Sequence, residues 1–225
     1  MARLILNPKK PGDRAIKGVI FDMDGTLCKP QTWMFKQMRD ALGIDKSIDI
    51  LDYVHSLPDN GPQQEAQLKL QAIERNAMVN MEAQPALVEV MDFIDKQKIP
   101  KAILTRNFPI PVEHLLTTFL TDHQFAPIVT REFKPPKPSP AGLYYITKAW
   151  NVDSENVVMV GDSIDDMLAG YRAGAATVLV SSDVNGHIED APETDVVVKT
   201  LGELIKVLEE GIELKPKAKE EDPLA

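Results

Sequence analysis

The chain has 225 residues, of which 44% are hydrophobic and 26% are charged, and its formal net charge at pH 7 is −9. This composition is typical of a globular protein with one hydrophobic core and room for a smaller second domain, and it excludes a disordered chain. The acidic balance argues against nucleic-acid binding, which normally needs a basic surface, and no apolar run approaches the roughly 20 residues that span a bilayer.

The N-terminus and the cysteine content bear on the compartment. Residues 1–16 form an extension that is basic, but Pro8 and Pro11 interrupt the amphipathic helix that a transit peptide needs. Cys28 is the single cysteine, so an intramolecular disulfide cannot form, as is usual in a reducing compartment. We therefore expect a cytoplasmic protein in which Cys28 is a small residue at a hinge and not a redox group.

Short apolar segments alternate with helical patterns along most of the chain. The segments lie at residues 19–21, 102–104, 128–129, 157–160 and 177–180. Each is a continuous apolar run, which is typical of a strand buried on both faces of a parallel sheet. Helical patterns lie at residues 84–97, 139–150, 163–174 and 201–211, the first with Leu87, Val88, Met91 and Ile94 at helical spacing. The order predicts an α/β fold with a doubly wound parallel sheet.

Residues 30–83 interrupt this alternation. They contain helical patterns at residues 31–43, 47–56 and 61–81 but no convincing strand, and Pro30 and Pro85 provide hinges at the two edges. The pattern predicts a small inserted helical domain within a core of residues 17–29 and 84–211. We expect Trp33, Met34 and Phe35 to belong mainly to the core of the insert, and we expect residues 212–225, which are charged and contain proline, to be disordered.

Four polar signals each follow the end of an apolar segment or precede the next helix. They are Asp22-Met23-Asp24-Gly25-Thr26, then Thr105, then Lys137 in a proline-rich loop, and finally Gly161-Asp162-Ser163 with Asp165 and Asp166. Because the carboxyl ends of the strands form the ligand crevice of an open α/β sheet, these four points can converge in space. Paired carboxylates at the end of a buried strand repel each other, so we expect a cation between them.

Several of these residues have a second interpretation. Asp162 could cap the following helix. Asp166, one turn along that helix, could bind metal or could orient Lys137, whereas Asp165 is predicted to be solvated. Lys134 lies in the same loop as Lys137 and is also predicted to be solvated. The four histidines, His55, His114, His123 and His187, lie outside every motif and are predicted to be surface residues.

The four signals in this order, with a helical insert between the first and the second, resemble the haloacid dehalogenase superfamily. The resemblance covers residues 17 to about 210 and is to the aspartate-nucleophile phosphatases with an α-helical cap, similar to phosphoglycolate phosphatases and β-phosphoglucomutases. It implies a Rossmann-like core, dependence on Mg²⁺ and a phosphoaspartyl intermediate. The third motif of the family matches Lys137-Pro138-Ser139-Pro140, while Arg106 stands where Asn often follows Thr in the second.

The resemblance also implies a role for each site residue. Asp22 is expected to be the nucleophile, and Asp24 is expected to be the general acid and base. The expected Mg²⁺ ligands are Asp22, Asp162 and the backbone carbonyl of Asp24, with Asp166 as either a further ligand or the residue that orients Lys137. The residues expected to bind the phosphate are Thr105, Arg106, Asn107 and Lys137. Because a halide needs no proton on leaving, the presence of Asp24 argues against carbon–halogen hydrolysis.

The prediction is a monomeric Mg²⁺-dependent phosphatase that acts on small phosphorylated metabolites. A phosphomutase of the β-phosphoglucomutase type and a non-catalytic binding module remain as alternatives, because no single residue separates them. Charges in the insert are mixed, so the sequence does not indicate the substrate. No nucleic-acid or membrane partner is expected.

Overall fold

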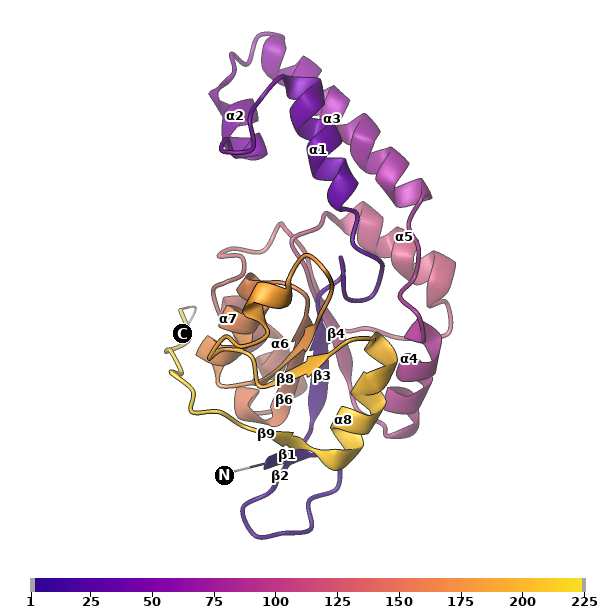
Figure 1. Cartoon of the computed structure of the whole chain (residues 1–225), viewed down its shortest axis with the longest axis vertical. Helices are drawn as coiled ribbons and strands as arrows, with labels where there is room; N and C mark the ends of the chain where they lie inside the picture. The colour runs from indigo at the N-terminus through magenta and orange to yellow at the C-terminus, as the bar shows by residue number, and fades with distance from the viewer. Residues whose placement is uncertain (1–2, 224–225) are drawn as a thin grey trace. The chain divides into compact units, whose positions relative to one another are not determined.

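A six-stranded parallel sheet forms the centre of the larger compact unit in the computed structural model, which describes residues 3–223 (Figure 1). Its strands follow the spatial order β5-β4-β3-β6-β7-β8. Their bounds are β3 Gly18–Phe21, β4 Lys101–Leu104, β5 Ile128–Val129, β6 Val157–Gly161, β7 Ala176–Val180 and β8 Val196–Val198. After β5 the chain crosses back to the other side of β3, so the winding reverses between β3 and β6. The predicted doubly wound parallel sheet is confirmed.

The apolar runs explain which strands lie at the centre. Every residue of β3, β4, β6 and β7 is buried, as expected for strands that are covered on both faces. The register pairs Ile20 with Ala102 on one side and with Met159 on the other, and all three belong to one core cluster. The edge strand β8 is only partly buried, and its short run was not predicted.

Helices cover both faces of this sheet, with α6 and α7 on one side and α4 and α8 on the other (Figure 1). The helices of this part of the chain are α4 Leu87–Lys96, α5 Pro109–Phe119, α6 Ala141–Trp150, α7 Ile164–Ala173 and α8 Leu204–Glu210, with short 3₁₀ turns η1 Ser154–Asn156, η2 Gly186–Ile188 and η3 Leu201–Glu203. On α4 the buried face includes Val90, while Val88, which was expected there, is exposed. Helix α5 was not predicted.

The N-terminal extension and the start of the C-terminal tail form a second, three-stranded sheet. Strand β1 (Arg3–Ile5) pairs in parallel with β2 (Arg14–Ala15) and antiparallel with β9 (Ile212–Glu213). Beyond β9 the tail makes side-chain contacts, including a 2.5 Å ion pair between Lys217 and Asp195, whose side chain is fully buried. Residues 212–213 thus form a strand and Lys217 has a buried partner, which differs from the expectation of disorder there, while residues 224–225 lie outside the described residues.

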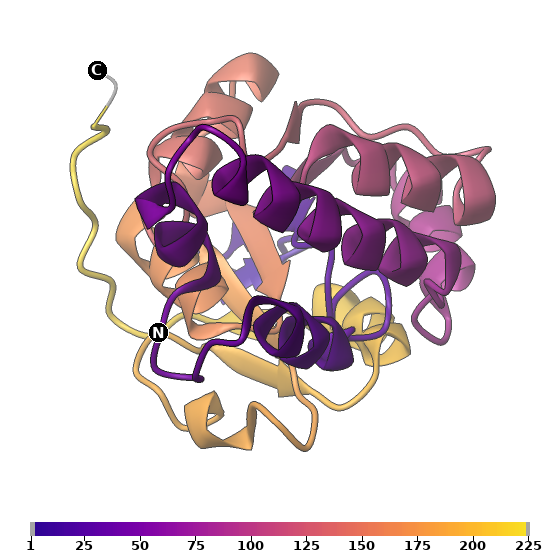
Figure 2. The same ribbon diagram turned by 90° about the horizontal axis from the view of Figure 1, so that it is seen from above.

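Residues Pro30–Glu82 form a separate compact unit, and the segments up to Lys29 and from Ala83 onward form the other. The separate unit contains α1 (Thr32–Leu42), α2 (Ile50–Ser56) and α3 (Pro62–Val79), with α1 and α2 each packed on α3 (Figures 1 and 2). Its core is Met38, Ile50, Val54, Ala66 and Leu70, with Met34 packed against it. Trp33 and Phe35 are exposed, contrary to the expectation that they belong to the core. No helix within residues 3–223 is long and apolar enough to cross a membrane.

Candidate active site

Three carboxylates converge where the winding of the sheet reverses. Asp22 follows β3 directly, Asp162 follows β6, and Asp166 lies in the first turn of α7. A carboxylate oxygen from each lies within 4.8 Å of one from each of the others. This edge is where open α/β sheets bind their ligands, and the predicted convergence of residues that are 144 positions apart is seen in the structure.

Lys137 joins two of these carboxylates. Its ammonium group lies 2.6 Å from Asp22 Oδ1 and 2.5 Å from Asp166 Oδ1, and the Lys137 side chain is 3% exposed. Burial by itself lowers the pKa of this ammonium, but the charges of Asp166 and Asp22 outweigh burial and raise it. Lys137 therefore stays a cation, while Lys134 in the same loop is exposed.

Burial raises the pKa of Asp22 well above the usual value for an aspartate, although the Lys137 charge opposes the shift. Burial also raises the pKa of Asp162 to about 7, with a further contribution from the charge of Asp166. Among the described residues no cationic side chain forms an ion pair with Asp162. Its carboxylate therefore has no counterpart to the Lys137 ammonium that pairs with Asp166.

Two glycines allow these side chains to come so close. Gly25 has a φ of +74°, and a Cβ atom built there would lie 1.9 Å from Asp162 Oδ2. A Cβ on Gly161 would lie 2.3 Å from Cβ of Asp166. Any larger residue at either position would push a carboxylate out of the cluster.

Asp166 has two tasks in the structure. One of its oxygens faces Lys137, and the other accepts bonds from the backbone N–H of Ser163 at 3.0 Å and from its hydroxyl at 2.6 Å. Ser163 and Asp166 thus form a capping box for α7, so the helix cap considered for Asp162 is provided by Ser163. The arrangement favours Asp166 as the residue that orients Lys137.

Asp24 is held from the loop that follows β4. The side-chain amide of Asn107 donates to Asp24 Oδ2, and the thiol of Cys28 lies 3.7 Å from Oδ1. Burial raises the pKa of Asp24, while the bonds from Cys28 and Asn107 lower it. Burial, with the nearby charges of Asp24 and Asp22, raises the pKa of the Cys28 thiol, which is unreactive in that state.

The second motif keeps its geometry although Arg106 intervenes. Thr105 is buried at the end of β4, and its hydroxyl accepts a 3.1 Å bond from the backbone N–H of Asn107. Arg106 is 60% exposed and forms a 2.7 Å ion pair with Asp165. Asp165 was predicted to be solvated and is instead the partner of this arginine on the rim of the site.

Two residues that hold the site were not predicted from the sequence. Asn185, buried after β7, donates its side-chain amide to the carbonyl oxygen of Asp162 at 2.7 Å and to that of Val180 at 3.0 Å. Gln84 donates to the carbonyl of Gly25 at 2.8 Å and ties the chain after the helical unit to the loop after β3. Both act through amide groups on backbone atoms, and no sequence motif marks such contacts.

Outside the site, the expectation that all four histidines lie on the surface is wrong for His123. Its side chain is 6% exposed, and Nδ1 lies 2.7 Å from Asp95 Oδ2. The same Asp95 is the partner of Lys101, whose side chain is 1% exposed. His123 and Lys101 thus share Asp95, whose own side chain is 44% exposed, at the amino end of β4.

The donor set fits a hard divalent cation. Asp22, Asp162 and Asp166 carry three negative charges when ionised and Lys137 carries one positive charge, which leaves two negative charges in excess. Carboxylate oxygens are the ligands that Mg²⁺ prefers, and the Asp162 carboxylate, without a cationic partner in the described part of the chain, is suited to this purpose.

Comparison with known proteins gives consistent matches. The model of a haloacid dehalogenase-like hydrolase family matches residues 16–174. An uncharacterized hydrolase of Saccharomyces cerevisiae is 45% identical over 203 residues, which cover 88% of this chain and 93% of that protein. A phosphoglycolate phosphatase of Haemophilus influenzae is 30% identical over 128 residues, or 55% of this chain and 56% of that protein. The crystal structure of a predicted phosphoglycolate phosphatase from Haemophilus somnus has a TM-score of 0.71 at 19% identity and covers 85% of this chain and 97% of its own, which shows a shared fold.

Proposed function

The chain belongs to the haloacid dehalogenase-like hydrolases, and we propose that it is a Mg²⁺-dependent phosphatase that hydrolyses small phosphate monoesters through Asp22. The observation that carries the proposal is the pairing of the buried Asp22 carboxylate with Lys137 beside Asp162, which has no cationic partner within residues 3–223. A nucleophilic carboxylate, a fixed cation and a candidate cation site thus lie together at one edge of the sheet.

Charge repulsion is the main obstacle to this reaction. Attack of the Asp22 anion on a phosphate dianion costs on the order of 4 kcal/mol for each pair of unit charges about 4 Å apart at an effective dielectric of 20. Lys137, held by Asp166, offsets part of this cost, and the Thr105 hydroxyl is a candidate donor to the phosphoryl oxygens. Asp22, Asp162 and the carbonyl of Asp24 would hold Mg²⁺, whose positive charge polarises a bound phosphoryl group.

Asp24 is proposed as the general acid and base. In the first step it would protonate the leaving alkoxide, and in the second it would take a proton from the water that hydrolyses the phosphoaspartate on Asp22. Burial raises the pKa of Asp24, which favours the protonated form that donates the proton, and Asn107 orients its carboxyl group. We also propose that residues 30–82 act as the helical cap of this family and select the leaving group.

The proposal is tested by p-nitrophenyl phosphate hydrolysis in the presence of Mg²⁺ and of EDTA. We expect turnover only with Mg²⁺ and a loss of about 10³-fold or more in Asp22→Asn, as for removal of other nucleophiles. Asp122→Asn, which changes an exposed aspartate outside the site, is the matched control and should retain the wild-type rate. Substantial activity in Asp22→Asn, or equal activity in EDTA, would overturn the mechanism.

The relatives guide the choice of physiological substrate. One of them is a phosphoglycolate phosphatase, so phosphoglycolate should lead a panel that also contains sugar phosphates and nucleotides. β-Glucose 1-phosphate distinguishes the two activities of this site, because a phosphatase releases inorganic phosphate whereas a mutase yields glucose 6-phosphate.

A further inference from the structure

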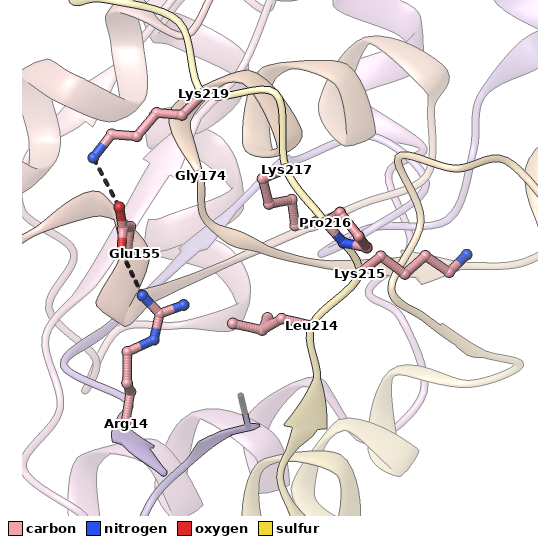
Figure 3. A pocket seen from close by; sticks show the side chains of 8 residues that line it. All are labelled: Arg14, Glu155, Gly174, Leu214, Lys215, Pro216, Lys217 and Lys219. Atoms are coloured by element: carbon pink, nitrogen blue, oxygen red, sulfur yellow. Dashed lines mark hydrogen bonds and ion pairs between the residues drawn. The ribbon is translucent and has the colours of Figure 1, made fainter. Parts of the chain in front are cut away.

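A separate cavity of about 350 Å³ lies at the amino ends of the strands, whereas Asp22 and Asp162 follow their carboxyl ends. Its charged lining is Arg14, Lys215, Lys217, Lys219 and Glu155 (Figure 3). Arg14 lies in β2 just before β3, Glu155 lies in η1 just before β6, and the lysines come from the C-terminal tail. The volume is within the range of small-molecule sites.

Positive charge is in excess around this cavity. Arg14 and Lys219 approach Glu155 from two sides (Figure 3), with Lys219 Nζ 3.2 Å from the carboxylate. Lys217 pairs with Asp195, and Lys215 donates to the neutral carbonyl of Ala191. Four cations therefore face the carboxylates of Glu155 and Asp195, and the charge of Glu193 also acts on Lys217. One positive charge is left over, in a chain whose net charge is −9, and it would attract an anion into the cavity.

Unused hydrogen-bonding capacity accompanies this charge. The Nε atom of Arg14 is buried and has no hydrogen-bond partner among the described residues, and buried donors of this kind normally have an acceptor. Burial lowers the pKa of Lys217 in spite of the attraction of Asp195, so this ammonium is also held at a cost that a bound anion would reduce. Both groups favour an additional acceptor in the cavity.

We propose that the cavity lined by Arg14, Lys217 and Lys219 binds a small molecule that carries a phosphate group. The planar guanidinium of Arg14 can donate to phosphate oxygens, and the two lysines add charge from the tail. The site is independent of the proposed phosphatase reaction, because none of its residues belongs to the carboxylate edge. The ligand would bind near the amino end of β6 and the carboxyl end of α7, whereas Asp162 and Asp166 lie at the other ends of these two elements.

The experiment is a titration of the ¹⁵N-labelled full chain with inorganic phosphate in EDTA at constant ionic strength. The backbone amide of Gly174 reports on the cavity that it lines, and that of Gly161 reports on the carboxylate edge, so binding at the two places is separated within one spectrum. We expect a saturable shift at Gly174. Absence of that shift, or an equal shift with acetate, would overturn the assignment to phosphate.

Two variants with opposite expected effects distinguish recognition from general loosening of the tail. Arg14→Gln should weaken phosphate binding about fivefold or more, and Glu155→Gln should tighten it about fivefold, because each changes one charge next to the anion. Lys206→Gln, which removes an exposed charge on α8, is the control and should change nothing. Lys219→Gln replaces Arg14→Gln if the latter does not fold. Changes of the same sign in the Arg14 and Glu155 variants would overturn the proposal.

Discussion

Replacement of Lys137 by methionine tests the electrostatic account of the site most directly. Methionine retains an unbranched apolar stem of similar length but removes the ammonium group between Asp22 and Asp166. The exposed fractions of the three side chains are 3%, 10% and 1% for Lys137, Asp22 and Asp166, so solvent cannot replace the lost cation. Lys134→Met in the same loop is the matched control, because Lys134 is exposed.

The size of the effect follows from these burials. Removal of one partner from a buried ion pair typically costs about 3–5 kcal/mol, because the remaining charge stays buried. For a chain of this length each kcal/mol lowers the melting temperature by about 2–4 °C. We therefore expect Lys137→Met to melt about 6–20 °C lower than the wild type in EDTA, and Lys134→Met to change little.

The pH dependence gives this prediction a sign. Burial already raises the pKa of Asp22, and the Lys137 charge counteracts that shift. Without Lys137 the pKa of Asp22 in the folded state rises further above its value in the unfolded state. The ionised Asp22 carboxylate therefore destabilises the folded state more as the pH increases. Thermal melts at pH 5 and pH 8 in EDTA should show the larger loss at pH 8. Equal melting of the two lysine variants, or a larger loss at pH 5, would refute the reasoning.

Three further predictions use the same structure. Gly25→Ala should lose most activity and unfold more easily in urea, because its Cβ would lie 1.9 Å from Asp162 Oδ2 and its φ is +74°; an unchanged kcat/KM would contradict this. Mg²⁺ should raise the melting temperature more at pH 8 than at pH 5, because burial raises the pKa of Asp162 to about 7 and a protonated carboxyl binds metal poorly. A Mg²⁺-induced shift of the same size in Asp162→Asn would show that the ion binds elsewhere. In urea unfolding, Asp95→Ala should lower the free energy of unfolding more than Lys101→Met does. Asp95→Ala leaves the buried Lys101 ammonium without its carboxylate, whereas Lys101→Met leaves the Asp95 carboxylate, which is 44% exposed and can be solvated. The reverse order would contradict this reasoning.

The central sheet could be predicted because burial on both faces leaves a clear trace in the sequence. Val157–Gly161 and Ala176–Val180 are nearly continuous apolar runs, and such runs are hard to place anywhere but inside a covered parallel sheet. Strands β2 and β9 have only two residues each, so no periodicity can appear in them. Helix α5 was missed because Pro109 and Pro111 lie in its first turn, where proline is tolerated although it is read as a breaker.

The site residues could be predicted where chemistry restricts the residue type. Asp22, Lys137 and Asp162 are charged residues next to buried strands or in proline-rich loops, and their cost of burial makes them conspicuous. Asn185 and the Arg106–Asp165 pair leave no such trace, because an amide or an exposed ion pair is common on any surface. The fold alone brings Asn185 to the carbonyl of Asp162.

The two ends of α7 carry charges of opposite sign, and the helix dipole accounts for both. Its amino end holds Asp165 and Asp166 in the first turn, and its carboxyl end lies at Gly174, in the cavity lined by Lys217 and Lys219. A helix stabilises anions at its amino end and cations at its carboxyl end, so each group of charges stands where the dipole lowers its energy. The same dipole opposes a divalent cation at the amino end and a phosphate at the carboxyl end, so the carboxylates and the cavity cations have to outweigh it for either ligand to bind. Because neither ligand needs a side chain that the other uses, saturation with Mg²⁺ should leave phosphate binding at Gly174 intact.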